Sequence, residues 1–204
     1  MKQHGALFTK ENRLAIREGR KTQTRRIPAS FKEINEHPDE WEFIGFEDEL
    51  ASFRLKGDES IFLVKPPWAV GDELYIKEPF AYDPDYNFPI YKDTKGYYNI
   101  KWKSPLFMPK WAARDWLRVT AVHCERLQSI SEEDAMAEGV LFMGGIADNW
   151  DEAPWCASIK DQEPMTFLRG AYARVWDSIN KKYKWAQNPW VVCYTFARLG
   201  VTNG

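Results

Sequence analysis

The sequence predicts an α+β fold or a small mixed β-barrel, built as a single domain. Segments with the two-residue alternation of strands recur along the 204 residues, and three segments have helical spacing. Strands and helices do not alternate regularly, so a doubly wound parallel sheet is not expected. The chain is long enough to bury a substantial core in one domain, and it contains no internal repeat.

The first predicted element is a short helix over residues 11–18. Thr9 is placed to cap its N-terminus, and Gly19 suits the position after its last turn, because glycine tolerates the left-handed conformation. Leu14 and Ile16 are the side chains expected to hold this helix against the domain. The polar and acidic residues 28–59 that follow are expected to leave the core as an excursion.

Three strands are predicted in the middle of the chain, over residues 60–64, 73–80 and 97–102. The second follows a Gly71-Asp72 turn. Residues 81–96 are rich in Tyr, Pro and Asp, which predicts a loop.

The longest predicted strand spans residues 115–127. Leu117, Val119, Ala121 and His123 alternate there with the intervening side chains and should share one face. His123 and its neighbour Cys124 then point to opposite faces, which argues against a Cys–His pair.

The C-terminal part predicts two helices and a last strand. Ser131 caps a helix that ends at Gly139, and a glycine-rich, acidic excursion follows over residues 140–165. Thr166 caps the longer helix, and the final strand covers residues 190–199.

The charge distribution favours local recognition of an anion. Residues 1–30 carry eight Lys/Arg and two Glu, a net +6, so the rest of the chain carries −8 of the total −2. No apolar stretch reaches membrane-spanning length, and residues 1–20 lack a signal-peptide core, so a cytoplasmic protein is expected. The three Cys and three His are too scattered to predict a disulfide framework or a structural zinc site, and no cofactor is expected.

The basic segment over residues 17–27 is the strongest functional signal. It holds five Lys/Arg side chains and two Thr hydroxyls in eleven residues. Lys21 and Thr24 stand three apart, so a desolvated Lys21 is a candidate base for the Thr24 hydroxyl. The alternatives are that Lys21 binds a phosphate while Thr24 bonds the backbone, or that the segment is a solvated loop.

Several motifs together resemble the ASCH family, a relative of the PUA fold, in the long phage and prophage form often labelled morphogenetic protein. The motifs are GRKTQTRR at 19–26, GDELYIKE at 71–78, MPKWAAR at 108–114, ERLQSISEEDA at 125–135, WDSIN at 176–180 and NPWV at 188–191. The resemblance implies a PUA-like β-barrel of about five or six strands with flanking helices. It further implies one ASCH-like domain over residues 1–204, with long loop insertions at about 28–59, 81–96 and 140–165, and a cleft beside residues 19–26 for RNA or modified nucleosides.

The resemblance also implies a catalytic set. Some compact ASCH proteins hydrolyse acetylcytidine with a Lys, a Thr three residues later and a Glu further along the chain. These positions correspond to Lys21 and Thr24, and Glu138 is the nearest equivalent of the Glu. The compact enzymes carry aliphatic residues where this chain has Gln23 and Arg25.

Five further residues are candidates for ligand binding. Arg20 and Arg26 belong to the basic segment, and Arg26 is the arginine expected to face the cleft. Glu78 ends a predicted strand and would either lie at the cleft, where it counters Lys21 or Arg26 or accepts a base-edge donor, or form a structural ion pair. Trp111 and Arg114 lie on a loop that would line the cleft, with Trp111 as a core residue the alternative.

The leading functional prediction is binding of RNA, or of a modified nucleoside or nucleotide, beside the basic segment. An amidohydrolase that deacylates acylated cytidine through the Lys-Thr-Glu set is the enzymatic alternative. A metal-assisted ribonuclease would need Glu78, Glu138 and Asp177 to cluster. A non-catalytic adaptor in phage morphogenesis is the remaining alternative, and the oligomeric state is left open.

Overall fold

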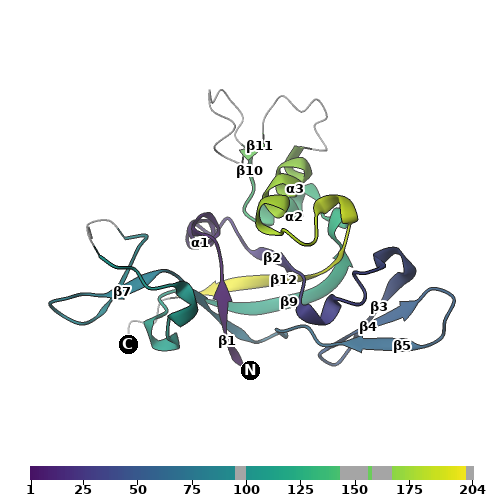
Figure 1. Cartoon of the computed structure of the whole chain (residues 1–204), viewed down its shortest axis with the longest axis horizontal. Coiled ribbons are helices and arrows are strands. Elements are labelled where there is room, and N and C mark those ends of the chain that lie inside the picture. Colours follow the sequence, from purple (N-terminus) through teal and green to yellow (C-terminus); the bar gives the residue numbers. More distant parts are fainter. Residues whose placement is uncertain (95–99, 143–155, 158–166, 201–204) are drawn as a thin grey trace.

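A five-stranded sheet forms the centre of the computed structural model, which describes residues 1–94, 100–142, 156–157 and 167–200 (Figure 1). The strand order is β1-β6-β9-β12-β2. These strands are β1 (Gln3–Leu7), β6 (Glu73–Lys77), β9 (Trp116–Arg126), β12 (Trp190–Leu199) and β2 (Gln23–Arg26). β1 and β6 are parallel, and the other neighbours are antiparallel.

Smaller sheets and three helices surround this centre. The remaining strands are β3 (Trp41–Glu47), β4 (Leu50–Leu55), β5 (Ile61–Val64), β7 (Phe80–Tyr82), β8 (Pro89–Tyr91), β10 (Leu141–Phe142) and β11 (Cys156–Ala157). The helices are α1 (Lys10–Arg17), α2 (Glu132–Ala137) and α3 (Phe167–Ile179). Short 3-10 turns cover Ala29–Phe31, Pro38–Glu40, Pro105–Phe107, Lys110–Ala112, Leu127–Ser129 and Trp185–Gln187. The architecture is α+β, as predicted, and no helix among the described residues is long and apolar enough to cross a membrane.

The capping signals of α1 are confirmed. The Thr9 hydroxyl accepts a hydrogen bond from the amide of Asn12 at 3.3 Å, and Gly19 has a φ of +74°. Ile16 is buried as expected, but Leu14 is 38% exposed. Two helical positions differ by about 200° around the axis, so Leu14 and Ile16 face opposite sides and only one reaches the core.

A bulge interrupts the pairing of β9 with β12. Thr195 lies opposite Ala121, whereas the next residue, Phe196, lies opposite Val119. Thr120 is therefore an extra residue in β9. Such an insertion reverses the side-chain alternation on either side of it.

The bulge corrects the predicted faces of β9. Leu117 and Val119 are buried as expected, but beyond the bulge Cys124 is the buried residue. Ala121 and His123 therefore do not continue the buried face that the sequence predicted. His123 and Cys124 do lie on opposite faces.

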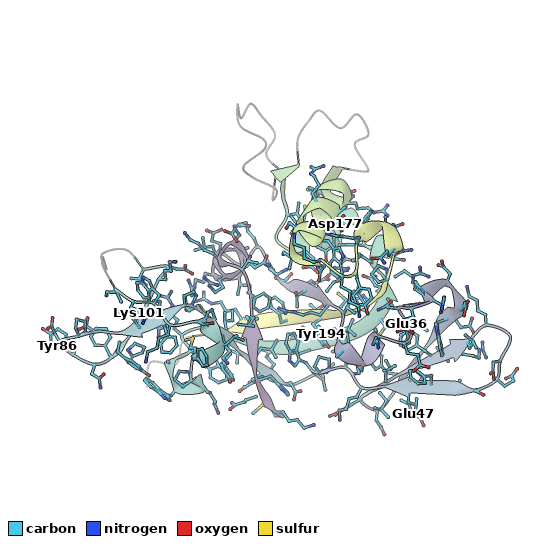
Figure 2. All side chains as sticks on the ribbon, viewed as in Figure 1. Glu36, Glu47, Tyr86, Lys101, Asp177 and Tyr194 are labelled. Carbon is cyan, nitrogen blue, oxygen red and sulfur yellow. The ribbon has the colours of Figure 1, made fainter. Side chains whose placement is uncertain are left out.

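Residues 28–59 are part of the main core, contrary to the predicted excursion. Phe31, Ile34 and Phe53 are completely buried there. Phe53 packs on Trp190 of β12 with ring centroids 5.2 Å apart. These few buried apolar side chains pack the segment against the central sheet, although most of its residues are polar. Figure 2 labels Glu36 and Glu47, two of its exposed polar residues.

The structure differs from the predicted loop at residues 81–96 and from the predicted strand at residues 97–102. Residues 81–96 are not simply a loop, since Phe80–Tyr82 and Pro89–Tyr91 pair as an antiparallel hairpin. The strand expected over residues 97–102 falls partly outside the described residues, and the described remainder is not a strand. Thr166 and most of residues 140–165 also lie outside the described residues.

The central sheet is not closed into a barrel by backbone pairing. β1 and β2 stand at opposite ends of the strand order, and no backbone ladder joins these two described strands. The side chain of Arg26 links them instead, because its Nη2 donates to the carbonyl of Leu7 at 2.7 Å.

We predict that Asn35 is required for the stability of this arrangement. Its buried amide donates to the carbonyl of Trp190 at 3.0 Å and accepts from the Trp190 amide at 2.6 Å. Asn35→Ala leaves both backbone groups unpaired and should lower the free energy of unfolding by about 2–4 kcal/mol. Chemical denaturation measures this, with the exposed neighbour Glu36→Ala as control. Equal effects of the two substitutions would contradict the assignment.

Candidate functional site

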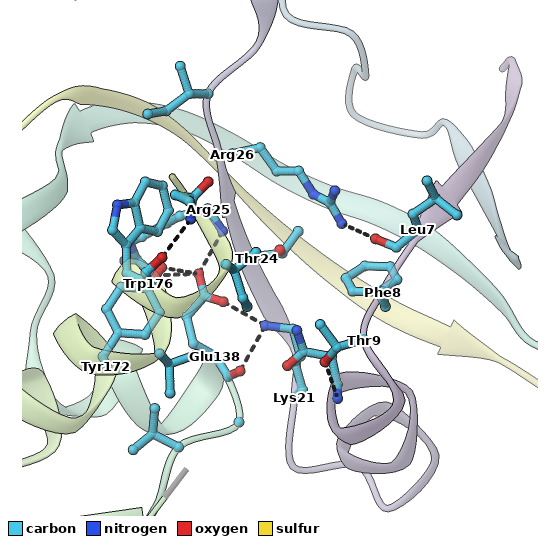
Figure 3. A pocket seen from close by; sticks show the side chains of 17 residues that line it. Leu7, Phe8, Thr9, Lys21, Thr24, Arg25, Arg26, Glu138, Tyr172 and Trp176 are labelled. Carbon is cyan, nitrogen blue, oxygen red and sulfur yellow. Dashed lines mark hydrogen bonds and ion pairs between the residues drawn. The ribbon is translucent and has the colours of Figure 1, made fainter. Parts of the chain in front are cut away.

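A cavity of about 240 Å³ opens beside β2 (Figure 3). Its walls come from the N-terminal segment, the entry to β2, the end of α2 and one side of α3. The lining residues are Leu7, Phe8, Thr9, Asn12, Lys21, Thr24, Arg25, Arg26, Ile27, Glu138, Gly139, Val140, Tyr172, Val175, Trp176, Ile179 and Asn180. We call this cavity the Lys21 pocket.

Backbone contacts turn Lys21 into the pocket. The amide of Lys21 donates to the carbonyl of Ala15 in α1 at 3.1 Å, and that of Thr22 donates to Ala137 in α2 at 2.8 Å. The segment before β2 is thus fixed between two helix ends. Gly139 has a φ of +94°, and a Cβ there would lie 3.3 Å from the Cβ of Lys21. Glycine permits both the left-handed turn and this close approach.

Lys21 and Glu138 form a buried ion pair. The Lys21 Nζ lies 2.6 Å from the Glu138 Oε2, and their side chains are 1% and 5% exposed. The same Nζ donates to the Glu138 carbonyl at 2.8 Å, where it satisfies a free carbonyl at the end of α2. Burial lowers the pKa of Lys21 against the opposing effect of Glu138. Glu138 lies at the C-terminal end of α2, where the helix dipole disfavours a carboxylate, and Lys21 offsets this unfavourable interaction.

Arg25 and Tyr172 complete the surroundings of Glu138. The Arg25 amide donates to the Glu138 Oε1 at 2.6 Å, and the Tyr172 hydroxyl donates to the same atom at 3.3 Å. The Arg25 guanidinium also pairs with Glu125 and Asp134, at 2.6 and 3.1 Å. Sequence reasoning missed both residues as parts of the site. The signal that could have identified Arg25 was its charge, because the compact ASCH enzymes carry an aliphatic residue at this position.

Thr24 and Arg26 line the same pocket. Thr24 is buried, and Figure 3 shows it on β2 near the Lys21–Glu138 pair. The Arg26 guanidinium carbon lies 4.9 Å from the centre of the Phe8 ring and 5.3 Å from that of Trp68. Its Nε is buried without a hydrogen-bond partner among the described residues, and burial lowers its pKa. The structure therefore brings together Lys21, Thr24, Glu138 and Arg26, four of the predicted site residues.

Glu78 and Arg114 belong to a separate ion network. Glu78 is fully buried and accepts two hydrogen bonds from Arg114, at 2.7 and 2.8 Å, and one from Arg17 at 2.8 Å. It does not face Lys21 or Arg26, contrary to one of the two predicted roles. Glu78 follows β6, which β9 and β12 separate from β2 in the strand order, and this separation is the physical reason. The structural ion pair was the correct alternative.

Arg20 and Trp111 also lie outside the Lys21 pocket. The Arg20 Nε donates to Glu18 at 2.8 Å at the surface. Trp111 is 66% exposed, so it is not the core residue that was considered, and its ring stacks on Tyr82 with centroids 6.1 Å apart.

The carboxylates required for a metal-assisted ribonuclease are not assembled. Glu138 faces Lys21, whereas Glu78 is held by arginines. Asp177 accepts a hydrogen bond from the amide of Trp185 at 2.7 Å and does not line the pocket. Each carboxylate has a structural partner of its own, so the three do not form a shared metal site.

A His–Glu–Cys cluster, which the sequence did not predict, lies beyond Arg25. His123 and Glu125 of β9 lie beside Cys193 of β12, with ligand atoms within 4.8 Å of one another. Burial raises the pKa of Cys193 to about 12. The pairing joins residues 68 or more apart in sequence, so spacing along the chain could not reveal it.

Similarity to known proteins is found at the level of structure. No family model matches the chain, and no curated protein matches it. Among solved structures, the chain is similar to the ASCH domain from Lactobacillus crispatus JV V101, with 12% sequence identity and a TM-score of 0.37. The similarity covers 97% of this chain and 79% of that chain.

We predict that Glu138 stabilises the fold by pairing with Lys21. Glu138→Gln leaves a buried ammonium without its carboxylate and should lower the free energy of unfolding by about 3–5 kcal/mol. The double variant Lys21→Met/Glu138→Gln should recover most of this loss. Denaturant titration measures both, and the exposed Glu133→Gln is the matched control. A double variant no more stable than Glu138→Gln alone would refute the coupling.

Proposed function

We propose that the Lys21 pocket binds a single nucleobase-sized ligand, supplied as a modified nucleoside or nucleotide or as one exposed nucleotide of RNA. The observation that supports this most is the convergence of Lys21, Thr24 and Glu138 on one cavity with aromatic walls. The resemblance of the basic segment to ASCH proteins points to the same ligand class.

The lining residues match the surfaces of a base. Phe8, Tyr172 and Trp176 offer apolar ring surfaces at the cavity, and aromatic rings are the usual partners of unstacked bases. Lys21 donates hydrogen bonds and Glu138 accepts them. The pocket therefore offers a partner to the acceptors and to the donors on the edge of a base.

The volume of the Lys21 pocket and the charges of its lining residues restrict the class of ligand further. A volume of about 240 Å³ is below the range of roughly 300–1,000 Å³ that drug-sized ligands occupy, so one base fits better than a strand. Three cationic side chains and one carboxylate line the cavity, which favours a ligand with carbonyl oxygens or a phosphate.

We predict that two arginines of the basic segment differ in their effect on binding. Arg26→Ala removes a cavity wall and should weaken binding of cytidine, acetylcytidine or their monophosphates by roughly ten-fold or more, measured by calorimetry. Arg20→Ala removes a charge outside the cavity and should leave nucleoside affinity unchanged. Thermal denaturation checks that both variants fold. If Arg26→Ala and Arg20→Ala lose the same amount of nucleoside affinity, the ligand does not bind in the Lys21 pocket.

Salt dependence separates the ligand classes. Neutral nucleosides should bind with an affinity that is nearly independent of salt, because no phosphate is neutralised. Short single-stranded RNA should lose roughly ten-fold or more between low and physiological salt if two or three phosphates contact the protein.

A second candidate function is hydrolysis of an acylated amino group on the bound base. The observation that favours it is the burial of Lys21 in a cavity that it shares with Thr24, since burial lowers the pKa of this lysine. In this reaction the Thr24 oxygen bonds to the acyl carbon as its proton passes to neutral Lys21. The C–N bond then breaks, and the leaving amine takes a proton from Lys21. Water hydrolyses the Thr24 ester to release the acid and restore the hydroxyl.

We predict a specific pH profile for this reaction. Turnover should rise with pH as Lys21 loses its proton, and Thr24→Val should abolish turnover with nucleoside binding retained. Glu138 raises the pKa of Lys21, so Glu138→Gln should move the rising limb to lower pH. Chromatographic detection of deacylated acetylcytidine is the assay. If the wild-type protein binds acetylcytidine but releases no deacylated product, the hydrolase function is refuted and only the binding function remains.

A further inference from the structure

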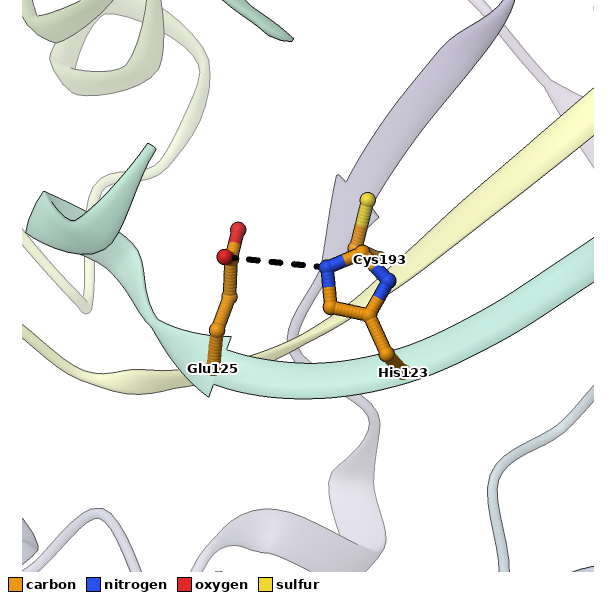
Figure 4. Close-up of side chains that lie close together, drawn as sticks. All are labelled: His123, Glu125 and Cys193. Atoms are coloured by element: carbon orange, nitrogen blue, oxygen red, sulfur yellow. Dashed lines mark ion pairs between the residues drawn. The ribbon is translucent and has the colours of Figure 1, made fainter. Parts of the chain in front are cut away.

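Three side chains with metal-binding atoms share one face of the central sheet. His123 of β9 and Cys193 of β12 are directly opposite each other in the antiparallel register, and Glu125 lies two residues further along β9. In Figure 4 a dashed line joins the His123 imidazole to the Glu125 carboxylate, and the Cys193 thiol lies close to the same ring. The backbone of two paired strands therefore holds all three.

The distances are short enough for one ion to bridge the three groups. The ligand atoms lie within 4.8 Å of one another, and the His123 Nε2 is 3.6 Å from the Glu125 Oε2. The His123 side chain is 44% exposed, whereas Cys193 is buried. Solvent thus reaches the cluster from the His123 side, which provides a path of entry.

We infer that His123, Glu125 and Cys193 form a binding site for a divalent transition-metal ion of the Zn²⁺ class. One sulfur, one imidazole nitrogen and one carboxylate oxygen are ligands that Zn²⁺ takes, whereas Mg²⁺ and Ca²⁺ prefer oxygen ligands alone. The ion forms a bond to the Cys193 sulfur as the S–H bond breaks and its proton leaves to solvent. Three protein ligands leave one position open toward solvent.

Arg25 of β2 positions one of the ligands. The Arg25 Nε donates to the Glu125 Oε1 at 2.6 Å, which leaves the Oε2 to face His123. A ligand side chain held by such an outer contact is typical of metal sites. The Cys193 thiol donates to the Gln23 Oε1 at 3.5 Å, and this hydrogen bond ends when the thiol gives up its proton to bind the ion.

The neighbouring charges tolerate a dication in spite of Arg25. The ion-paired network holds two cations, Lys21 and Arg25, against the three carboxylates of Glu125, Asp134 and Glu138. Its formal charge is therefore −1. Replacement of one thiol proton by a dication adds +1 and makes the network neutral.

Cobalt titration followed by absorption spectroscopy tests the site directly. The Cys156→Ser protein is used throughout, so that only Cys124 and Cys193 remain. Addition of Co²⁺ should produce a thiolate-to-cobalt charge-transfer band that saturates at one equivalent, and Zn²⁺ should abolish it by displacement. Cys193→Ser should lose the band, whereas Cys124→Ser, which removes the buried thiol on the opposite face, should keep it.

His123 is the metal ligand whose replacement is least expected to disturb folding, because its side chain is 44% exposed. His123→Ala removes a partly exposed side chain, so this variant should fold, and its Co²⁺ affinity should fall by at least about 100-fold. Absence of the band from the parent protein, a band that survives Cys193→Ser, or unchanged affinity in His123→Ala would each overturn the inference.

Discussion

The ion pair between Lys21 and Glu138 is the interaction on which the rest of the site depends. It joins the entry to β2 with the C-terminal end of α2, two segments 117 residues apart. Both charges are nearly inaccessible to water, which is costly unless each finds several partners. The Glu138 carbonyl, the Arg25 amide and the Tyr172 hydroxyl supply those partners. The Lys21–Glu138 pair therefore fixes the position of α2 relative to β2 of the central sheet.

Arg25 connects two chemically different surroundings. On one side its backbone amide binds Glu138 at the Lys21 pocket, and on the other its guanidinium binds Glu125 beside His123. The Lys21 pocket and the His–Glu–Cys cluster consequently share one charged residue. A change in charge at either site alters the electrostatic environment of the other, since the Arg25 side chain that contacts both is fully buried.

The bulge in β9 determines which side chains reach the His–Glu–Cys cluster. Without the extra residue Thr120, the alternation that buries Leu117 and Val119 would continue through His123. The reversal buries Cys124 on the core side and leaves His123 and Glu125 beside Cys193. A single inserted residue therefore decides whether the histidine packs in the core or is available to a ligand.

The sequence by itself determined the local features of this protein. The cap at Thr9, the glycines after α1 and α2, and the strand over residues 190–199 were all predictable. The cap and the glycines depend on neighbours within a few residues, through steric limits on φ and short-range hydrogen bonds. The strand was indicated by the two-residue alternation of its side chains. The placement of Lys21, Thr24 and Glu138 in one cavity was also anticipated, although only through the family resemblance.

Only the tertiary structure decided which distant groups meet. Glu78 pairs with Arg17 and Arg114 instead of Lys21 or Arg26, the acidic residues 28–59 contribute Phe31 to the core, and Cys193 lies opposite His123. These outcomes depend on strand order and register, which are selected by burial and pairing over the whole domain. Sequence periodicity constrains the face of a strand but not its partner, and one bulge changes even the face. The chemistry of both sites arises from those long-range pairings.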